Sequence, residues 1–235
     1  MAETTKSIVF DTGPIISLAT NNLLWILEPL EKAFGGDFLM PPGVRKELID
    51  NPLRSKRFKF EAMQALNLVN NGVLKIVDDS SLNSEIEELM DIANKIFRAK
   101  GNWMQIVHYG EIGAIAVAMM MGSSAMVIDE RTTRMLIEDP DSLRKMMEKK
   151  LHTKVEMNKD NLNEFGKRTK GIKMIRSTEL AMMAYEKGLL DRFLPNIPQA
   201  RKELIDGVLW GIKLNGCSIS EMEIDRIIKL ETKNG

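Results

Sequence analysis

The 235-residue chain has 33 Lys and Arg and 33 Asp and Glu, so its formal net charge at pH 7 is zero. This balance gives no global positive field, and a polyanion would have to be held by a local patch. A single cysteine excludes an internal disulfide and a zinc site built from several cysteines. No run approaches the ~18 apolar residues of a membrane span, and no signal-peptide core is visible. We therefore expect a cytoplasmic protein without a membrane partner.

The first predicted element is a short apolar strand at 7–10, which is followed immediately by the carboxylate of Asp11. A helix should begin within a few residues, because Gly13 permits a tight turn and Pro14 suits a first helical position. Open α/β sheets bind their ligands at the carboxyl ends of their strands. Asp11 is therefore a candidate functional residue.

Strand-like and helical segments then alternate, which is typical of a parallel sheet covered by helices. In chain order we expect a helix at 22–34, a strand at 37–40, helices at 44–49 and 58–71, a strand at 73–77, helices at 82–99 and 111–121, and a strand at 125–128. The predicted fold class is α/β, a three-layer sandwich with a central parallel sheet and helices on both faces.

The remainder of the chain is more charged. Residues 138–171 are interpreted as an inserted helix, a short strand at 154–157 and a mobile loop. A last strand at 172–175 is followed by helices at 178–188, 198–214 and 221–232. No linker divides the chain, so we treat 1–235 as a single domain.

A second predicted strand, 125–128, also ends at a carboxylate, Asp129. Two like charges brought together are costly unless a cation neutralises them, so the pattern predicts a metal site. Glu47 and Glu111 are further candidates, and carboxylate oxygens are the ligands that Mg²⁺ or Mn²⁺ prefers.

Each of these residues also has a purely structural interpretation. Glu111 could complement a helix dipole, worth roughly 0.3–1 kcal/mol. Asp129 could be an N-cap, and Glu47 could be a solvated helix residue. Thr12 could hold an ion or a phosphate through its hydroxyl, or could cap the turn.

Four segments carry these acids, and together they resemble a known family. They are VFDTGPIISLA at 9–19, LMPPGVRKEL at 39–48, YGEIGAIA at 109–116 and VIDERTTR at 127–134. Their order and spacing resemble the motifs of PIN domains, in particular the VapC-like group of predicted nucleic-acid-binding proteins. The segment 177–190 is also similar to the tail of this group.

The resemblance implies a PIN-like fold and a metal-dependent ribonuclease. Asp11, Glu47, Glu111 and Asp129 would be the catalytic acids. Mg²⁺ or Mn²⁺ would be held by Asp11, Glu111 and Asp129, with Glu130 as an additional or substitute ligand; we prefer Asp129 as the fourth acid. The substrate-binding residues would be Thr12 and Arg131. The expected activity is endonucleolytic cleavage of RNA by a metal-activated water. The family further suggests a toxin, an antitoxin-like protein partner and a homo-oligomer.

The chain departs from compact family members at 82–107 and 138–171, which are insertions, and in a helical C-terminal extension at 196–235. These additions motivate an alternative, a non-catalytic RNA-binding or assembly module that retains the acidic pocket. A phosphatase-like hydrolase with Asp11 as nucleophile is a more remote alternative. Basic clusters at 54–59 and 167–176 could contact phosphates, although charge runs are more often solvated surface.

Overall fold

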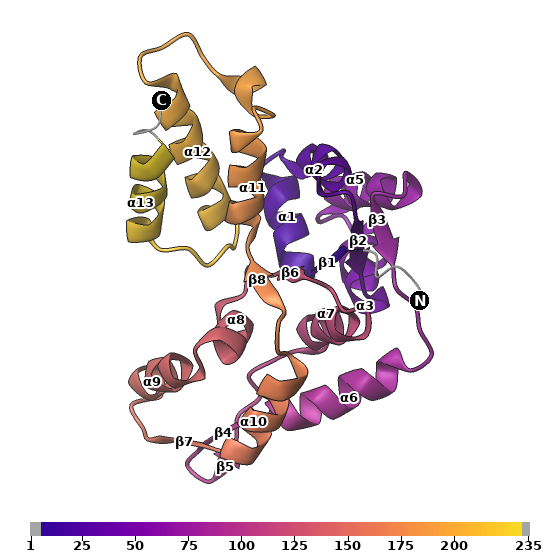
Figure 1. Ribbon diagram of the computed structural model, residues 1–235, viewed down its shortest axis with the longest axis vertical. Helices are drawn as coiled ribbons and strands as arrows, with labels where there is room; N and C mark the ends of the chain where they lie inside the picture. Colours follow the sequence, from indigo (N-terminus) through magenta and orange to yellow (C-terminus); the bar gives the residue numbers. More distant parts are fainter. Residues whose placement is uncertain (1–5, 232–235) are drawn as a thin grey trace.

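The computed structural model describes residues 6–231 and contains a five-stranded, fully parallel central sheet in the order β3-β2-β1-β6-β8 (Figure 1). The strands are β1 (Ser7–Phe10), β2 (Asp37–Met40), β3 (Leu74–Ile76), β6 (Ala125–Val127) and β8 (Lys173–Ile175). Helices cover both faces, so the predicted α/β sandwich is confirmed. The last position of the helix expected at 221–232 lies outside the described residues.

The central strand β1 is buried along its whole length, as expected for a strand covered on both faces. Its side chains alternate between the two layers: Ile8 and Phe10 belong to one core and Val9 to the other. The same alternation holds in β2 and β6. This period of two is what divides the apolar side chains into two cores.

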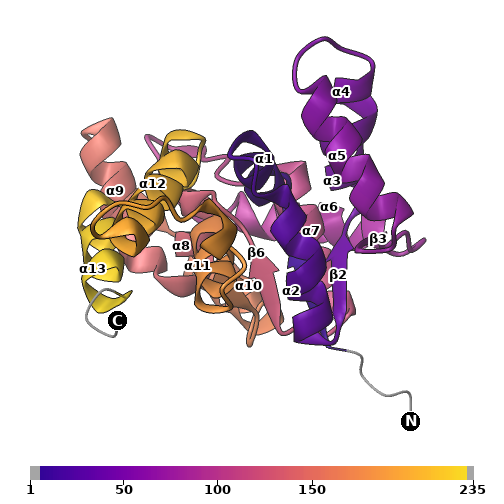
Figure 2. The ribbon, with the colours of Figure 1, turned by 90° about the horizontal axis from the view of Figure 1, so that it is seen from above.

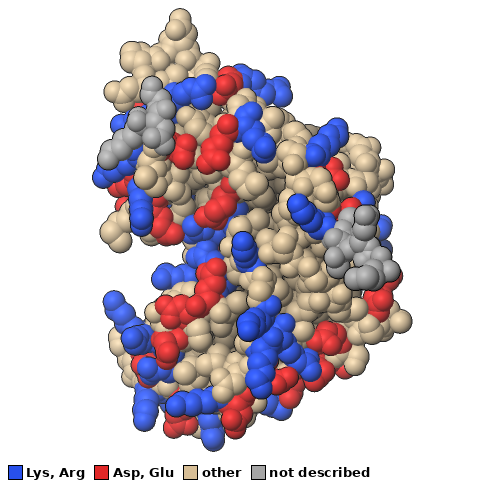
Figure 3. Space-filling model, viewed as in Figure 1, with Lys and Arg blue, Asp and Glu red and all other residues tan. Residues whose placement is uncertain are grey.

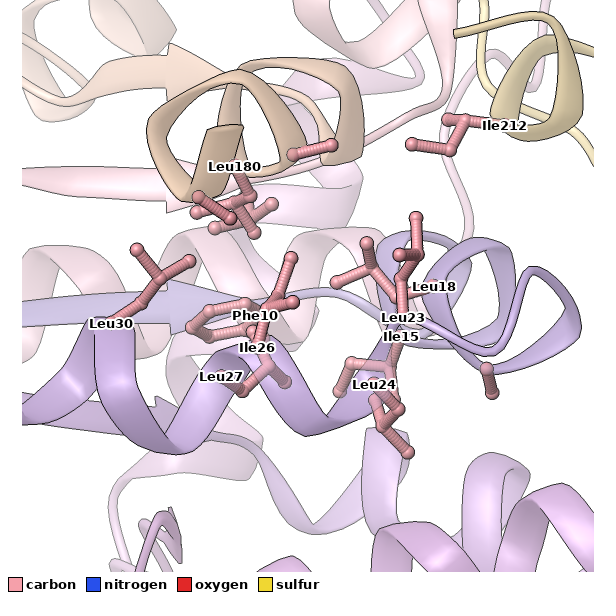
Figure 4. Packing of buried hydrophobic residues seen from close by; sticks show 14 of the residues in the cluster. Phe10, Ile15, Leu18, Leu23, Leu24, Ile26, Leu27, Leu30, Leu180 and Ile212 are labelled. Atoms are coloured by element: carbon pink, nitrogen blue, oxygen red, sulfur yellow. The ribbon is translucent and has the colours of Figure 1, made fainter. Parts of the chain in front are cut away.

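The core on the first face is formed with α1 (Thr12–Thr20), α2 (Leu27–Phe34), α5 (Lys59–Asn70) and α11 (Ser177–Glu186). Figure 4 shows Phe10 of the sheet among Leu27 and Leu30 of α2 and Leu180 of α11. The short helix η1 (Leu24–Ile26) precedes α2, so the helix expected at 22–34 is shorter and broken. α12 (Ala200–Leu214) and α13 (Glu221–Glu231) extend this layer, with η3 (Asp191–Phe193) before them.

The core on the second face is centred on α7 (Tyr109–Met120), whose residues from Ile112 to Ala118 are buried. α6 (Leu82–Ala93), α8 (Arg131–Glu138), α9 (Pro140–Leu151) and α10 (Lys159–Arg168) surround it. Between β2 and α5 the chain forms one helical run made of α3 (Pro42–Arg45), the π-helical segment η2 (Lys46–Asp50) and α4 (Asn51–Leu53).

The two segments at 82–107 and 138–171 are joined by a second, antiparallel sheet in the order β5-β4-β7. Its strands are β4 (Phe97–Ala99), β5 (Asn102–Trp103) and β7 (Val155–Met157), and Arg98 pairs with Glu156. Arg168 of α10 adds ion pairs to Glu85 (3.1 Å) and Glu88 (2.5 Å) of α6. The two segments therefore form one structural unit beside the sheet.

Two local predictions are wrong in this unit. Residues 97–99 are a strand rather than the end of a helix, because a hairpin turn at 100–101 returns the chain and β7 pairs with them. Residues 159–168 are a helix rather than a mobile loop. The Asn158 side chain caps this helix by accepting hydrogen bonds from the backbone of Asp160 and Asn161, and Phe165 anchors it in the core.

The C-terminal helices contact the sheet near the end of β6. The Ser218 amide donates to the Asp129 carbonyl (3.2 Å), and the buried Cys217 lies in the first core. Figure 3 shows acidic and basic side chains interspersed over this face, with a notch between the C-terminal helices and the part of the molecule that holds α8 and α9. Within 6–231, no helix combines the length and apolarity that crossing a membrane requires.

Candidate functional site

The candidate site lies at the carboxyl edge of the central sheet, where Asp11 follows β1. Asp11 is the N-cap of α1, and its Oδ2 accepts a hydrogen bond from the Gly13 amide (3.4 Å). Only 7% of the residue is exposed. Burial raises the pKa of Asp11 to about 7, and the charges of Glu111 and Glu47 contribute to the rise to a lesser degree. Hydrogen bonds from the backbone amides of Thr12 and Gly13 act in the opposite direction and lower it. The site therefore holds a carboxyl group that is costly to ionise.

Glu47 reaches this region from the helical run after β2. Its Oε2 accepts a hydrogen bond from the hydroxyl of Thr12 (3.0 Å), the residue next to Asp11. A side chain on Gly110 would place its Cβ 3.3 Å from the same oxygen. The Glu47 carboxylate thus lies between the start of α1 and the start of α7, and Gly110 leaves room for it.

Glu111 lies in the first turn of α7. Its Oε2 accepts hydrogen bonds from the Thr133 hydroxyl (2.6 Å) and the His108 amide (3.2 Å). Partial burial raises the pKa of Glu111, and the nearby Glu130 charge adds to the rise. This position is compatible with both interpretations of Glu111. Its carboxylate lies at the N-terminus of α7, where it complements the helix dipole, and it is also close to the charge of Glu130.

Glu130 caps α8 by accepting a hydrogen bond from the Thr133 amide (2.7 Å). Thr133 therefore contacts both Glu111 and Glu130 and holds these two carboxylates around one residue. Glu130 is exposed, as is Arg131 at the first position of α8. Arg131 makes no ion pair with a described residue, so its guanidinium is open to a ligand.

Asp129 is buried and differs from the other acids in its partners. Its Oδ1 accepts from the Ser177 amide (2.8 Å), and its Oδ2 accepts from the hydroxyls of Ser17 (2.7 Å) and Ser177 (2.7 Å). Asp129 and Asp11 both lie against Gly13, at 3.7 and 3.5 Å from the position of its missing Cβ. Asp129 is close to the cluster, but its carboxylate is occupied by two serines that tie α1, β6 and α11 together. It does not cap α8, since the neighbouring Glu130 does so.

The structure therefore brings Asp11, Thr12, Glu47, Glu111, Asp129 and Glu130 to one edge of the sheet. Sequence reasoning did not identify Ser17, Ser177 and Thr133, which hold the acids in place. The signal for Ser177 was available, since it begins a helix directly after a predicted strand and so reaches the same edge.

The donor set suits a hard divalent ion, since it consists of carboxylate oxygens in mutual repulsion. Oε1 of both Glu47 and Glu111 accepts no hydrogen bond from a described residue, so each has an oxygen to offer. Within 6–231, however, no three His, Cys, Asp or Glu side chains are grouped closely enough to hold an ion. Binding one would require the glutamate side chains to move toward Asp11.

A basic loop projects near this edge. Residues 54–59 contain Arg54, Lys56, Arg57 and Lys59, all exposed, and none forms an ion pair within the described part of the chain. Arg57 lies 4.7 Å from the ring centroid of Phe58. Figure 2 shows the loop beyond α4 standing out from the molecule. Arg54 follows directly on the helical run that carries Glu47, since α4 ends at Leu53.

No family model matches the chain, and neither the curated proteins nor the solved structures contain a match to it.

Proposed function

We propose that this chain is a metal-dependent ribonuclease that hydrolyses RNA phosphodiester bonds at the acidic cluster. The observation that carries the proposal is the buried Asp11 carboxyl, whose pKa is raised to about 7 beside Glu111 and Glu47. Such a group at the carboxyl edge of a parallel sheet has the properties expected of a functional site rather than of a structural one.

In this proposal Asp11 and Glu111 would hold Mg²⁺ or Mn²⁺. The chemistry supplied by a bound ion is neutralisation of charge on the phosphate and a lowered pKa of bound water. Glu47, whose Oε2 accepts a hydrogen bond from Thr12, would accept a proton from the attacking water through its open Oε1. Arg131, exposed at the start of α8, would contact a phosphate.

The hydrogen bonds favour Glu130 over Asp129 as a further ligand beside Asp11 and Glu111. Asp129 already accepts from Ser17 and Ser177, whereas Glu130 is exposed and contacts Glu111 through Thr133. We therefore assign Asp129 a positioning role: it fixes the start of α11 and the body of α1 relative to the acids.

The basic loop supports RNA as the substrate. Four exposed cations without carboxylate partners among the described residues can hold phosphates, and the loop follows directly on the helical run that carries Glu47. A neutral chain can therefore still attract a polyanion locally. The toxin role, the antitoxin-like partner and the homo-oligomer remain predictions from the resemblance.

Cleavage of a mixed RNA pool with Mn²⁺, compared among wild type, Asp11→Asn and Glu111→Gln, tests the proposal. Glu87→Gln is the matched control, because Glu87 is an exposed acid on α6. We expect loss of cleavage by at least 100-fold in the two site variants and no change in the control. Equal cleavage by wild type and Asp11→Asn, or none by wild type, would overturn the proposal.

A non-catalytic RNA-binding or assembly module is the second candidate. It is favoured by the separation of the carboxylates, since no three of them are grouped for an ion within 6–231. This candidate predicts RNA binding in the presence of a chelator and no cleavage when Mn²⁺ is added. The same cleavage series therefore separates the two functions.

A further inference from the structure

A pocket of about 320 Å³ lies where the unit built from the two segments meets the acidic edge. Its walls come from the connection between β5 and α7, from α9 and from the start of α8. The volume falls within the ~300–1,000 Å³ range of small-molecule pockets. The proposed ribonuclease function uses only one side of this pocket.

One wall is apolar and rich in methionine. Met104 and Ile106 contribute from the connection before α7, and Met146 and Met147 contribute from α9. Thioether side chains are polarisable and unbranched, and they make favourable contacts with aromatic rings. This wall therefore suits a flat, polarisable group.

The rim of the pocket is polar and has only a few side chains that can form hydrogen bonds. Gln105 and Lys150 are exposed there, and His108 and Thr132 complete it. A glutamine amide can donate to and accept from the edge of a base, and a lysine can bind a phosphate as a point charge. An apolar wall with a few hydrogen-bonding groups at its edge is how proteins hold unstacked RNA bases.

The remaining wall consists of Glu111 and Glu130, two acids of the candidate site. A group in the pocket is therefore adjacent to the atoms that would act on the phosphodiester. The acidic wall disfavours an anion inside the pocket, and the neutral base of a nucleotide avoids this repulsion while its phosphate reaches Lys150 or the acidic site.

We infer that this pocket binds one unpaired nucleobase of the RNA, next to the phosphodiester that the acidic cluster cleaves. The inference rests on the proposed function and adds its substrate class, single-stranded RNA with a base accommodated by the two segments. The β4–β7 pairing holds the two halves of the apolar wall together, because β5 leads into Met104 and α9 leads into β7.

The test is RNA binding measured in a chelator, so that no cleavage takes place. The probes are a mixed-sequence RNA hexamer and a sugar–phosphate hexamer of the same length that lacks bases. Both hexamers carry a fluorescent dye at one end, and the fluorescence anisotropy of the dye follows binding. We expect the hexamer with bases to bind about tenfold more tightly.

Gln105→Ala and Met104→Ala should reduce this preference for bases by at least threefold, and the exposed Gln105→Ala should do so without changing the thermal midpoint. Lys150→Ala should weaken binding of both hexamers, and the adjacent Lys149→Ala is the matched control, since Lys149 is exposed but does not line the pocket. Equal binding of the two hexamers by wild type, or equal effects of the two lysine variants, would overturn the inference.

The two proposals fail in different ways. If the hexamer binds through the pocket but wild type cleaves no RNA with Mn²⁺, the ribonuclease proposal fails and the base pocket stands. If cleavage depends on Asp11 but the pocket variants keep the same base preference as wild type, the base pocket fails alone. Tighter binding of an apolar peptide than of the hexamer would also overturn the pocket's assignment to RNA.

Discussion

At the scale of single residues, the environment of Asp11 strongly opposes its ionised form. Its pKa rises from 3.8 to about 7, which corresponds to at most about 4 kcal/mol. Between pH 4 and 7 the native state binds more protons than the unfolded state, so stability falls as the pH rises through this window. Above pH 7 the penalty is fully present.

We therefore expect Asp11→Asn to raise the free energy of unfolding at pH 8 by about 1–3 kcal/mol and to have little effect at pH 4. Asparagine keeps the N-cap, because it ranks with aspartate at this position. Urea unfolding of both proteins at the two pH values measures the difference. A variant that is equally stable or less stable at pH 8 would contradict the assignment of an ionisation penalty to this carboxylate.

At Asp129 we expect a substitution to lower the free energy of unfolding, because its carboxylate accepts hydrogen bonds from Ser17 and Ser177. Ser177→Ala removes the hydroxyl that donates to this buried carboxylate, and we expect it to destabilise the protein by about 1–3 kcal/mol. Ser123→Ala is the comparison, since it removes a neutral hydrogen bond to Ser7 (2.7 Å) in a similarly buried place and should cost less. Equal losses in denaturant unfolding would argue against a positioning role for Ser177.

At the scale of elements, the basic loop at 54–59 gives a prediction about salt dependence. A variant with Arg54→Ala and Lys56→Ala should bind single-stranded RNA more weakly and lower the slope of log K against log salt by about 1.4, since each phosphate that a cation neutralises adds about 0.7 to the slope. A pair of exposed cations far along the chain, Lys187→Ala with Lys202→Ala, serves as the control. An unchanged slope in the loop variant would show that the loop is only a solvated surface.

A second element, α13, is joined to the start of α11 by an ion pair of Arg176. This side chain is 12% exposed and donates to Glu179, to Glu223 of α13 (3.0 Å) and to the Ser218 carbonyl (3.2 Å). Burial opposes ionisation of Glu223, but hydrogen bonds from Ser220 and Arg176 lower its pKa to about 2. The pairing is therefore present at neutral pH and disappears only as the pH falls toward 2.

We expect Arg176→Met to cost about 2–3 kcal/mol, because Glu179 and Glu223 lose their partner while staying partly hydrated. Amide hydrogen exchange in 217–231 should accelerate while exchange in β1 stays slow. Glu28→Gln, which breaks the exposed pair with Lys32, is the control. Uniform acceleration across the molecule would contradict a local anchor.

At the scale of the whole molecule, the central sheet and its acidic edge could be predicted from the sequence. The strands at 7–10, 37–40 and 125–128 are apolar and short, and each ends at a carboxylate or proline that stops it. Parallel pairing places all their carboxyl ends at one edge, so Asp11 and Asp129 were expected to meet.

The second sheet could not be predicted, because β4 pairs with a strand more than 50 residues later and nothing in its three residues distinguishes it from a helix end. The partners of Asp129 were hidden for the same reason: Ser17 and Ser177 lie 112 and 48 residues away from it. Long-range contacts decide whether an acid is a ligand or a structural group, and local sequence patterns do not reveal them.

In the proposed function the carboxylates around Asp11 take up a divalent ion, and Mn²⁺ binding followed by electron paramagnetic resonance tests this central claim most directly. At pH 8 we predict that wild type binds Mn²⁺ and that Asp11→Asn loses at least one bound ion per chain, while Glu87→Gln binds as wild type does. Equal Mn²⁺ binding by wild type and Asp11→Asn, or no binding by either, would contradict the claim.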